Sequence, residues 1–277
     1  MKNRYIPEFD LTGKNIIVTG AYGLIGKEIC DAFSSAGANV IISDIADEKA
    51  LKDYAEKLSC KHSTRNMGIY LDITDPESIK SGIENILNHY DGIDVLVNNA
   101  AIDAKFDENI ININPTRFEN YPVDELEKSM NVNITGTVKI TKEVVKNMLK
   151  NKKGNIINVT STYAIVAPDQ RLYKKPGEEN QTYKPVDYII TKSFIPGFTR
   201  YLAALYAKDG IRVNTIAPHG VYNNHDTDFV KRFSERSPLG RMCDLKELRG
   251  PFIFLASDAS SYMTGSILVV DGGWSIW

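Results

Sequence analysis

The chain has 277 residues, and its 33 Lys and Arg nearly balance its 35 Asp and Glu, which gives a formal net charge of −2. This balance argues against a nucleic-acid-binding protein, which normally carries a basic excess, and against a polybasic membrane-surface protein. Apolar residues make up 43% and charged residues 25%, as in ordinary globular proteins and unlike disordered chains. Because no repeat or linker divides the sequence, we expect a single domain over residues 1–277.

The three cysteines, Cys30, Cys60 and Cys243, are far apart in the sequence. No pair has zinc-site spacing and none adjoins a histidine cluster, so we expect neither a disulfide framework nor a metal site. Reduced thiols of this kind indicate a cytoplasmic protein. Residues 1–10 lack the apolar core of a signal peptide, and no apolar run approaches the roughly 20 residues that span a bilayer. We therefore expect no membrane association.

Short β-rich apolar runs alternate with longer amphipathic segments along the chain. The expected strands are 16–18, 40–42, 69–71, 93–97, 156–159, 211–216 and 267–270. The expected helices are 24–36, 47–58, a segment starting at Asp75, 124–150, 186–208 and 245–256. Such alternation indicates parallel βαβ units with right-handed crossovers. The expected fold is a single-domain, doubly wound parallel α/β sheet of the Rossmann type, with about seven strands and helices on both faces.

A glycine-rich segment, Thr-Gly-Ala-Tyr-Gly-Leu-Ile-Gly at 19–26, directly follows the first expected strand and opens the first helix. Glycines let the backbone turn tightly and approach a pyrophosphate, while the helix N-terminus offers free N–H groups and positive dipole charge. The alternative is a plain turn that needs glycine only for steric reasons. Three glycines, Gly20, Gly23 and Gly26, in so short a span favour a dinucleotide site.

Asp44 ends the second expected strand, 18 residues after Gly26. A carboxylate at this point accepts hydrogen bonds from the ribose hydroxyls and repels a 2′-phosphate. No Arg or Lys stands at positions 21, 22, 43 or 45 to bind such a phosphate. We therefore expect NAD rather than NADP as cofactor. Alternatively, Asp44 is a solvated strand end or a helix cap, although Asp47 can serve as the cap instead.

Two further positions suit a dinucleotide. Asp72 lies just beyond the third expected strand, where a carboxylate can reach the adenine amino group. Asn98-Asn99-Ala100-Ala101 follows the fourth expected strand. Small and amide residues at this end of a strand suit the crevice in which doubly wound sheets bind ligands.

Tyr188 and Lys192 are four residues apart at the start of the helix after the fifth expected strand. On a helix they share one face, and a cation there lowers the pKa of the phenol, which lets Tyr188 act as acid or base nearer neutral pH. The spacing alone is common, so the evidence comes from its placement near the carboxyl edge of the sheet. Ser161, which ends the fifth strand, would point its hydroxyl into the same crevice.

Asn133 lies on the long expected helix, roughly aligned with Leu126, Met130 and Thr137. An amide on an apolar face is costly unless it is paired, which favours a role in the site. The local alternatives are that Asn133 clamps buried backbone and that Ser161 is a turn residue. Together with Tyr188 and Lys192, the two residues favour the catalytic interpretation.

These motifs together resemble the short-chain dehydrogenase/reductase family, in its single-domain branch, over residues 14–274. The matching motifs are the 19–26 turn, Asp72, Asn98-Asn99-Ala100, Asn133, Ser161, Tyr188 with Lys192, Arg212-Val213-Asn214, Pro218 and the tail segments within 254–273. By this resemblance Tyr188 is the general acid/base and Ser161 holds the substrate carbonyl or hydroxyl. Lys192 binds the nicotinamide ribose and tunes Tyr188, and Asn133 holds a water that relays protons to Lys192.

The resemblance also implies which residues bind ligands. The cofactor-binding residues would be Gly20, Tyr22, Gly23, Leu24, Ile25, Gly26, Asp44, Asp72, Ile73, Asn99, Ala100, Tyr188, Lys192, Pro218, Gly220 and Val221. The substrate-binding residues would be Ser161, Tyr163, Gln170 and His219, with a substrate-binding loop at 219–244. No metal is expected.

The sequence departs from the family pattern in three places. The glycine spacing is TGxxGxxG where this branch usually has TGxxxGxG, and His219 replaces the glycine that usually follows Pro218. Ser161 precedes Tyr188 by 27 residues, about twice the usual separation, which leaves Thr160 and Thr162 as alternatives to the serine. The surplus is the polar segment 168–185, an inserted loop on the substrate side.

Such an insertion is similar to that of dehydrogenases from bacterial flagellin-glycan and nonulosonic-acid pathways, which implies a sugar-type substrate. The polar residues of the insert suit a hydroxyl-rich or anionic ligand; they are Gln170, Arg171, Tyr173, Lys174, Glu178, Glu179, Asn180 and Gln181. The alternative is a solvated loop without a ligand role.

The sequence therefore predicts a cytoplasmic, NAD(H)-dependent oxidoreductase that interconverts a secondary alcohol and a ketone of a small-molecule substrate of the sugar or sugar-acid type. Two alternatives remain: an NAD-using sugar epimerase or dehydratase, and a non-catalytic dinucleotide-binding module. Relatives commonly form tetramers, and Trp274 and Trp277 at the apolar C-terminus suit an interface, so we expect a dimer or tetramer.

Overall fold

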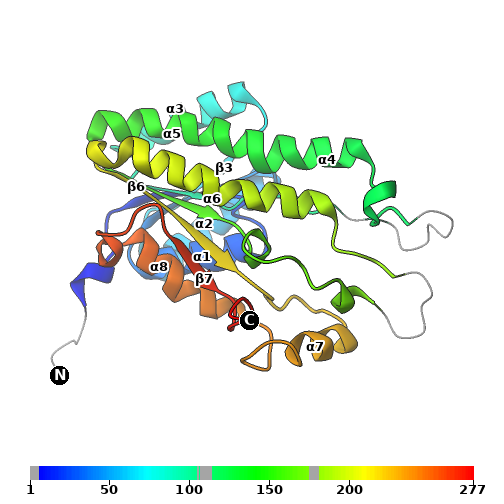
Figure 1. The fold of residues 1–277 in the computed structure, drawn as a ribbon. Coiled ribbons are helices and arrows are strands. Elements are labelled where there is room, and N and C mark those ends of the chain that lie inside the picture. The colour runs from blue at the N-terminus through cyan, green and yellow to red at the C-terminus, as the bar shows by residue number, and fades with distance from the viewer. Residues whose placement is uncertain (1–5, 105, 107–113, 175–180) are drawn as a thin grey trace.

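One parallel sheet of seven strands forms the centre of the molecule, in the order β3-β2-β1-β4-β5-β6-β7 (Figure 1). The computed structural model describes residues 6–104, 106, 114–174 and 181–277. The strands are β1 (Asn15–Thr19), β2 (Asn39–Asp44), β3 (Met67–Tyr70), β4 (Val95–Asn98), β5 (Gly154–Val159), β6 (Ile211–Pro218) and β7 (Ile267–Val270). Strand order reverses between β1 and β4, which opens a crevice at their carboxyl ends. The expected doubly wound fold is confirmed.

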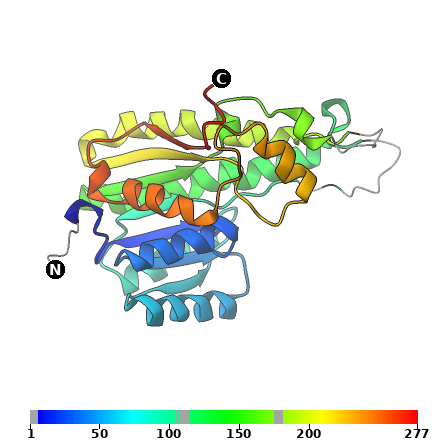
Figure 2. The same cartoon turned by 90° about the horizontal axis from the view of Figure 1, so that it is seen from below.

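Helices cover both faces of the sheet, which is why every residue of β1, β4 and β5 is buried (Figure 2). One face packs against α1 (Leu24–Ser35), α2 (Glu48–His62) and α8 (Arg249–Ala256). The other packs against α3 (Pro76–His89), α5 (Thr137–Asn151) and α6 (Val186–Tyr206). The remaining α-helices of the described residues are α4 (Val123–Met130) and α7 (Thr227–Ser234).

Short 3-10 turns connect several of these elements. They are Pro7–Phe9, Phe118–Asn120, Thr162–Ala164, Gln170–Tyr173, Ala207–Asp209, Leu245–Leu248 and Asp258–Ser260. Two helix starts follow the expected cap chemistry. The Asp47 carboxylate accepts a hydrogen bond from the Ala50 N–H at 3.0 Å, and the Asp75 carboxylate accepts one from the Glu77 N–H, also at 3.0 Å. Since Asp47 caps α2, Asp44 is not needed as the cap.

The long helix expected at 124–150 is interrupted by a π-helical segment, Asn131–Gly136, between α4 and α5. A π turn shifts the register of the side chains that follow it. The expected alignment of Asn133 with Met130 is therefore wrong: Asn133 is buried, whereas Met130 is 39% exposed. The buried side of the helix carries Ser129, Asn133 and Thr137 instead.

Helix α7 lies within the expected loop 219–244 and was not expected as a helix. The Asp226 carboxylate caps it by accepting a hydrogen bond from the Phe229 N–H at 2.8 Å. Only Phe233 of its eight residues is buried, so the apolar pattern is too short to reveal the helix. In Figure 1, α7 and the segment after β5 extend beyond the carboxyl ends of the strands.

The two described ends of the insert, 168–174 and 181–185, are tied together by hydrogen bonds. The Gln170 Oε1 accepts from the Lys184 N–H at 2.9 Å, and the Gln170 carbonyl accepts from the Gln181 Nε2 at 2.7 Å. The Asn114 Nδ2 donates to the Gln181 carbonyl at 2.6 Å, which joins the insert to the segment after β4. Glu178, Glu179 and Asn180 lie outside the described residues.

All three cysteines are free thiols, in agreement with the expectation from their spacing. Over the described ranges, no helix combines the length and the apolar character that crossing a bilayer requires.

Candidate active site

A large cavity of about 910 Å³ lies at the carboxyl ends of β1 to β4, and we call it the large cavity. It extends from the glycine turn to α6. The expected cofactor residues that border it are Gly20, Tyr22, Gly23, Leu24, Ile25, Gly26, Asp44, Asp72, Ile73, Asn99, Ala100, Tyr188, Lys192 and Val221. Residues from six separate segments of the chain thus meet at one edge of the sheet.

The three positions of the turn are occupied by glycine for different structural reasons. Gly20 has a φ of +61°, and a Cβ there would lie 2.7 Å from the Ala100 Cα. A Cβ on Gly26 would lie 2.2 Å from the Gly20 carbonyl oxygen. A Cβ on Gly23 would meet nothing closer than 3.4 Å, an ordinary contact. Packing of the chain therefore requires Gly20 and Gly26, whereas Gly23 leaves open space at the N-terminus of α1.

The Asp44 carboxylate is fixed at the rim of the large cavity by two backbone groups. It accepts hydrogen bonds from the Tyr22 N–H at 2.9 Å and from the Ala46 N–H at 3.1 Å. The neighbouring Ile45 is 65% exposed and borders the same cavity. Asp72 is fixed in a similar way, because one of its oxygens accepts from both the N–H and the hydroxyl of Thr74 at 2.7 Å.

Asn99 joins the end of β4 to the glycine turn. Its Nδ2 donates to the carbonyl oxygens of Thr19 and Gly20, both at 3.0 Å. The Thr19 hydroxyl oxygen in turn accepts from the N–H groups of Asn99 and Ala100, both at 3.1 Å. Thr19 thus holds the end of β4 against the glycine turn. Apart from the place of Thr19 in the turn, nothing in the sequence indicates this contact.

A second cavity of about 250 Å³, the small cavity, adjoins the large one. Ile25, Thr160, Tyr188, Val221 and His225 border both cavities. Of the other expected site residues, the small cavity is bordered by Ser161, Tyr163, Pro218, His219 and Gly220. Gln170 is different: it borders neither cavity, and its side chain accepts the hydrogen bond from the Lys184 N–H. In this structure the Gln170 side chain holds the insert, and its expected role as a substrate contact remains a prediction.

Tyr188 lies near the start of α6, and Lys192 follows one turn later. The Lys192 side chain is buried, its Nζ donates to the Val159 carbonyl at 3.2 Å, and it lies 5.9 Å from the Tyr188 ring centroid. Burial raises the pKa of Tyr188 to about 12, although the hydrogen bond with Ser161 acts in the opposite direction and lowers it. Burial also lowers the pKa of Lys192 to about 8.

The expectation that a cation would lower the pKa of Tyr188 is therefore wrong for this structure. Desolvation of the phenol outweighs the favourable contacts, because a buried phenolate loses its hydration. Tyr188 is thus a protonated phenol at neutral pH, which makes it a proton donor in this state of the site.

Three neighbouring hydroxyls follow β5, and the structure separates them. Ser161 is buried, faces the small cavity with Tyr188, and its Oγ accepts from the Tyr163 N–H at 3.2 Å. The Thr160 hydroxyl donates to the Lys192 carbonyl at 2.6 Å. Thr162 is fully buried and borders neither cavity. Of the three, Ser161 is the hydroxyl placed to meet a ligand beside Tyr188.

The buried Asn133 side chain clamps backbone, the alternative that the sequence left open. Its Oδ1 accepts from the Ile102 N–H at 2.8 Å, and its Nδ2 donates to the Ile102 carbonyl at 2.8 Å. The same Nδ2 donates to the Thr191 hydroxyl at 3.1 Å. Asn133 thus joins the segment after β4 to the helix of Tyr188 and Lys192. Its expected role in holding a water remains a prediction.

Two charged residues of the site, Lys184 and Asp103, were not expected from the sequence. The Lys184 ammonium forms an ion pair with Asp103 and lies 4.0 Å from the Tyr188 ring centroid. Lys184 borders the small cavity and Asp103 the large one, so the pair sits where the two cavities meet. Lys184 is four residues before Tyr188 in the sequence, but it precedes the helix, so helical spacing does not reveal the contact.

His219 is buried in a cluster of aromatic rings. Its ring centroid lies 5.1 Å from that of Tyr163, 5.3 Å from that of Phe233 and 4.6 Å from that of Trp274. Burial lowers the pKa of His219 to about 4, so the imidazole is neutral at neutral pH. Its Nε2 has no hydrogen-bond partner among the described residues, and the side chain borders the small cavity.

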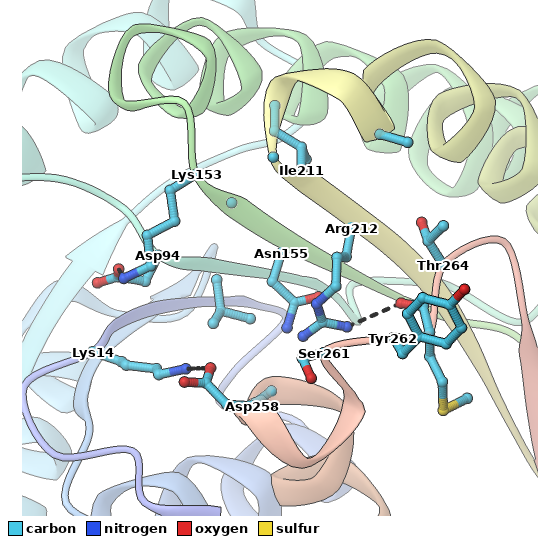
Figure 3. Close-up of a pocket in the computed structure, with 16 residues that line it drawn as sticks. Lys14, Asp94, Lys153, Asn155, Ile211, Arg212, Asp258, Ser261, Tyr262 and Thr264 are labelled. Carbon is cyan, nitrogen blue, oxygen red and sulfur yellow. Dashed lines mark hydrogen bonds and ion pairs between the residues drawn. The ribbon is translucent and has the colours of Figure 1, made fainter. Parts of the chain in front are cut away.

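A separate cavity of about 560 Å³ lies at the opposite, amino edge of the sheet (Figure 3). Its charged residues pair with one another or with backbone. Lys14 pairs with Asp258 at 2.7 Å, Lys153 pairs with Asp94 at 3.2 Å, and Arg212 donates to the Met263 carbonyl at 3.1 Å. None of the expected site residues borders it. The candidate active site is therefore at the carboxyl edge.

A doubly wound sheet with a glycine turn at its switch point, and with Ser161, Tyr188 and Lys192 at one edge, defines the class of nicotinamide-dependent oxidoreductases. A family model described as enoyl-(acyl carrier protein) reductase matches residues 20–275. The chain belongs to the short-chain dehydrogenase/reductase family.

Two curated relatives match nearly the whole chain. The 3-oxoacyl-[acyl-carrier-protein] reductase of Aquifex aeolicus is 32% identical over 270 residues, which are 96% of this chain and 99% of the relative. The post-translational flagellin modification protein A of Campylobacter coli is 31% identical over 267 residues, 96% of this chain and 100% of the relative. The second match agrees with the resemblance suggested by the long insertion.

Two solved structures illustrate the fold with bound cofactors. A gluconate 5-dehydrogenase from Burkholderia cenocepacia, in complex with NADP and tartrate, has a TM-score of 0.84 at 25% identity, covering 98% of each chain. A short-chain dehydrogenase from Leptospira borgpetersenii with bound NAD+ has a TM-score of 0.81 at 30% identity, covering 99% of this chain and 98% of that one. Both forms of the dinucleotide thus occur among similar proteins.

Proposed function

We propose that this protein is an NAD(H)-dependent oxidoreductase that interconverts a secondary alcohol and a ketone of a sugar or sugar acid. One observation carries the proposal: Tyr188 borders both cavities, with Lys192 on the side of the large cavity and Ser161 on the side of the small one. The large cavity would hold the dinucleotide and the small cavity the substrate. The acid/base residue would then stand between the two reactants.

The residues of the large cavity fit a dinucleotide. Gly23 leaves space at the N-terminus of α1, where N–H groups and the helix dipole favour the pyrophosphate. The fixed Asp44 carboxylate would accept hydrogen bonds from the ribose hydroxyls, and the exposed neighbour Ile45 carries no charge for a 2′-phosphate. These features favour NAD over NADP. The bound nicotinamide supplies or accepts the hydride.

In the reducing direction, Tyr188 would donate its proton to the carbonyl oxygen of the substrate, because the phenol is protonated at neutral pH. The Ser161 hydroxyl would hold the same oxygen in place. The buried Lys192 ammonium would bind the nicotinamide ribose and stabilise the phenolate that remains. In the oxidising direction Tyr188 must first lose its proton, so oxidation should become faster as the pH rises.

The sugar-type substrate rests on the polar groups of the small cavity and on the similarity to the flagellin modification protein. The other relative is named a 3-oxoacyl-[acyl-carrier-protein] reductase, so a 3-oxoacyl thioester belongs in any substrate panel. Net oxidation of NADH would separate the proposed reaction from an epimerase or dehydratase that keeps its NAD. Binding without turnover of any substrate would favour the non-catalytic module.

We also propose a cytoplasmic dimer or tetramer. Tyr201 and Leu205 on α6 are 65% and 49% exposed, Val269 on the edge strand β7 is 39% exposed, and the C-terminal Trp277 is 81% exposed. Apolar groups on these elements suit contacts between copies. Sedimentation velocity on the purified protein gives the test, with a monomer at micromolar concentration as the contrary result.

The first experiment is a titration of the purified protein with NADH and, in parallel, NADPH, followed by cofactor fluorescence. Tight NADH binding with weak NADPH binding is expected. Tighter NADPH binding would contradict the choice of cofactor but leave the enzyme class intact. Binding of neither would overturn the proposed function, since the shifted glycine spacing would then have removed the dinucleotide site.

A further inference from the structure

The charges around the small cavity bear on the chemical class of its ligand. Among the described residues that border it, Lys184 is the one side chain with a permanent charge, and these residues include no Asp or Glu. Burial lowers the pKa of His219 and of His225, so both imidazoles are neutral near pH 7. The one permanently charged group on the border of the small cavity is therefore an ammonium, paired with Asp103 on its other side, beside the groups expected to react.

The Lys184 ammonium has a defined place in the site. Its backbone N–H is held by the Gln170 side chain at 2.9 Å, and Pro185 follows it at the start of α6. The Lys184 side chain is only 13% exposed, and its Nζ lies 4.0 Å from the Tyr188 ring centroid. A group bound by this ammonium would therefore lie close to the reacting carbon.

The ammonium also has donors to spare. An ammonium has three N–H donors, and Asp103 accepts one of them. Besides Asp103, the described residues give the Lys184 Nζ a contact with the Tyr188 ring at 4.0 Å but no second oxygen or nitrogen acceptor. Asp103 borders the large cavity and is 42% exposed, so the side of the ammonium that faces the small cavity is left to a ligand. A mostly buried ammonium is stabilised by a further anionic partner.

We infer that Lys184 binds a carboxylate of the substrate, so that the small cavity selects compact hydroxy acids and keto acids over uncharged polyols and sugars. This inference rests on the proposed function, because it takes the small cavity to be the substrate site. The unpartnered Nε2 of the neutral His219 would bind a hydroxyl of the same molecule. A cavity of about 250 Å³ limits the ligand to a compact molecule.

The test compares tartrate with threitol. Both compounds have four carbons and the same two central hydroxyls, but the terminal groups are carboxylates in tartrate and CH₂OH groups in threitol. Each is titrated by calorimetry at constant ionic strength into protein saturated with NADH. For wild type we expect tartrate to bind at least tenfold more tightly than threitol. Lys184→Met should remove this preference, and Lys184→Arg should keep most of it. Lys174→Met is the matched control, because Lys174 is an exposed lysine of the same insert and borders neither cavity.

Three outcomes would overturn the inference. Wild type could show no preference for tartrate, which includes binding of neither probe, or Lys184→Met could keep the preference, which would mean adventitious anion binding elsewhere. The third is that Lys174→Met loses the preference for tartrate to the same extent as Lys184→Met. NADH affinity is measured first for every variant and should change less than twofold. A wild-type protein that fails to bind NADH would overturn the proposed function itself, at a separate step of the experiment.

Discussion

The ammonium of Lys184 lies 4.0 Å from the ring centroid of Tyr188, closer than the ammonium of Lys192, which lies at 5.9 Å. Lys192 belongs to the motif that the sequence reveals, whereas Lys184 belongs to the end of the insert. Lys192 directs its Nζ to the Val159 carbonyl. The insert therefore adds a second cation to the surroundings of the phenol, paired with Asp103.

Tyr188→Phe should reduce turnover about 1,000-fold, because the phenylalanine ring has no hydroxyl to donate or accept the proton. The affinity for NADH should change less than threefold, since the ring remains in place. Steady-state rates and a fluorescence titration measure the two quantities. Tyr201→Phe is the control, because Tyr201 lies on the same helix but is 65% exposed. Equal turnover in wild type and Tyr188→Phe would remove Tyr188 from the mechanism.

Gly23→Ala and Gly26→Ala should affect different properties: Gly23→Ala the affinity for NADH, and Gly26→Ala the stability of the fold. A Cβ on Gly26 would lie 2.2 Å from the Gly20 carbonyl oxygen, so Gly26→Ala should lower the melting temperature by several degrees. A Cβ on Gly23 would meet the protein at 3.4 Å, so Gly23→Ala should fold normally but bind NADH at least tenfold more weakly. Thermal unfolding and NADH titration measure both. Full NADH affinity in Gly23→Ala would place the pyrophosphate elsewhere.

The double substitution Asp44→Ser with Ile45→Arg should reverse the choice of cofactor. It removes the carboxylate that would repel a 2′-phosphate and adds a cation at a residue that is 65% exposed. We expect NADH affinity to fall about tenfold and NADPH affinity to rise about tenfold, as for one charge-assisted contact each. Asp47→Ser, at the cap of α2, is the control. Unchanged affinities for both cofactors would show that Asp44 does not contact the ribose.

His219 should make the folded protein sensitive to mild acid. Burial lowers its pKa from 6.5 to about 4, so the unfolded chain takes up the proton first as the pH falls. Its contribution to stability is complete above pH 6.5 and is lost as the pH falls toward 4. Between pH 7.5 and 4.5, wild type should lose about 2 to 3 kcal/mol more unfolding free energy than His219→Gln. Urea unfolding of both proteins at the two pH values measures this difference, and an equal loss would contradict a buried, neutral His219.

Much of the site could be predicted because its motifs are local. Gly20, Gly23 and Gly26 follow a strand and open a helix, and Tyr188 and Lys192 share one turn of α6. In both cases the spacing in the chain fixes the spacing in space. The parallel order of the strands then brings their carboxyl ends to one edge, as expected for a doubly wound sheet.

Other features could not be predicted because they depend on contacts between distant segments. The π turn that follows Met130 places Asn133 on a different side of the helix, where its side chain binds the Ile102 backbone. The hydrogen bond by which the Gln170 side chain holds the Lys184 backbone joins residues 14 positions apart, and no local pattern indicates it. The pKa of Tyr188 moved opposite to the expectation, because burial and the neighbouring Asp103 carboxylate raise it and outweigh the lowering by the Ser161 hydrogen bond.

The sequence by itself determined the doubly wound sheet, the glycine turn at its carboxyl edge and the shared helical face of Tyr188 and Lys192, because apolar periodicity and helical spacing are properties of short segments. Only the tertiary structure decided which charges surround Tyr188. Asp103 follows β4 and Lys184 precedes α6, 81 residues apart in the chain. Their pairing depends on how the insert packs over the carboxyl edge of the sheet, and no local pattern in the sequence encodes that packing.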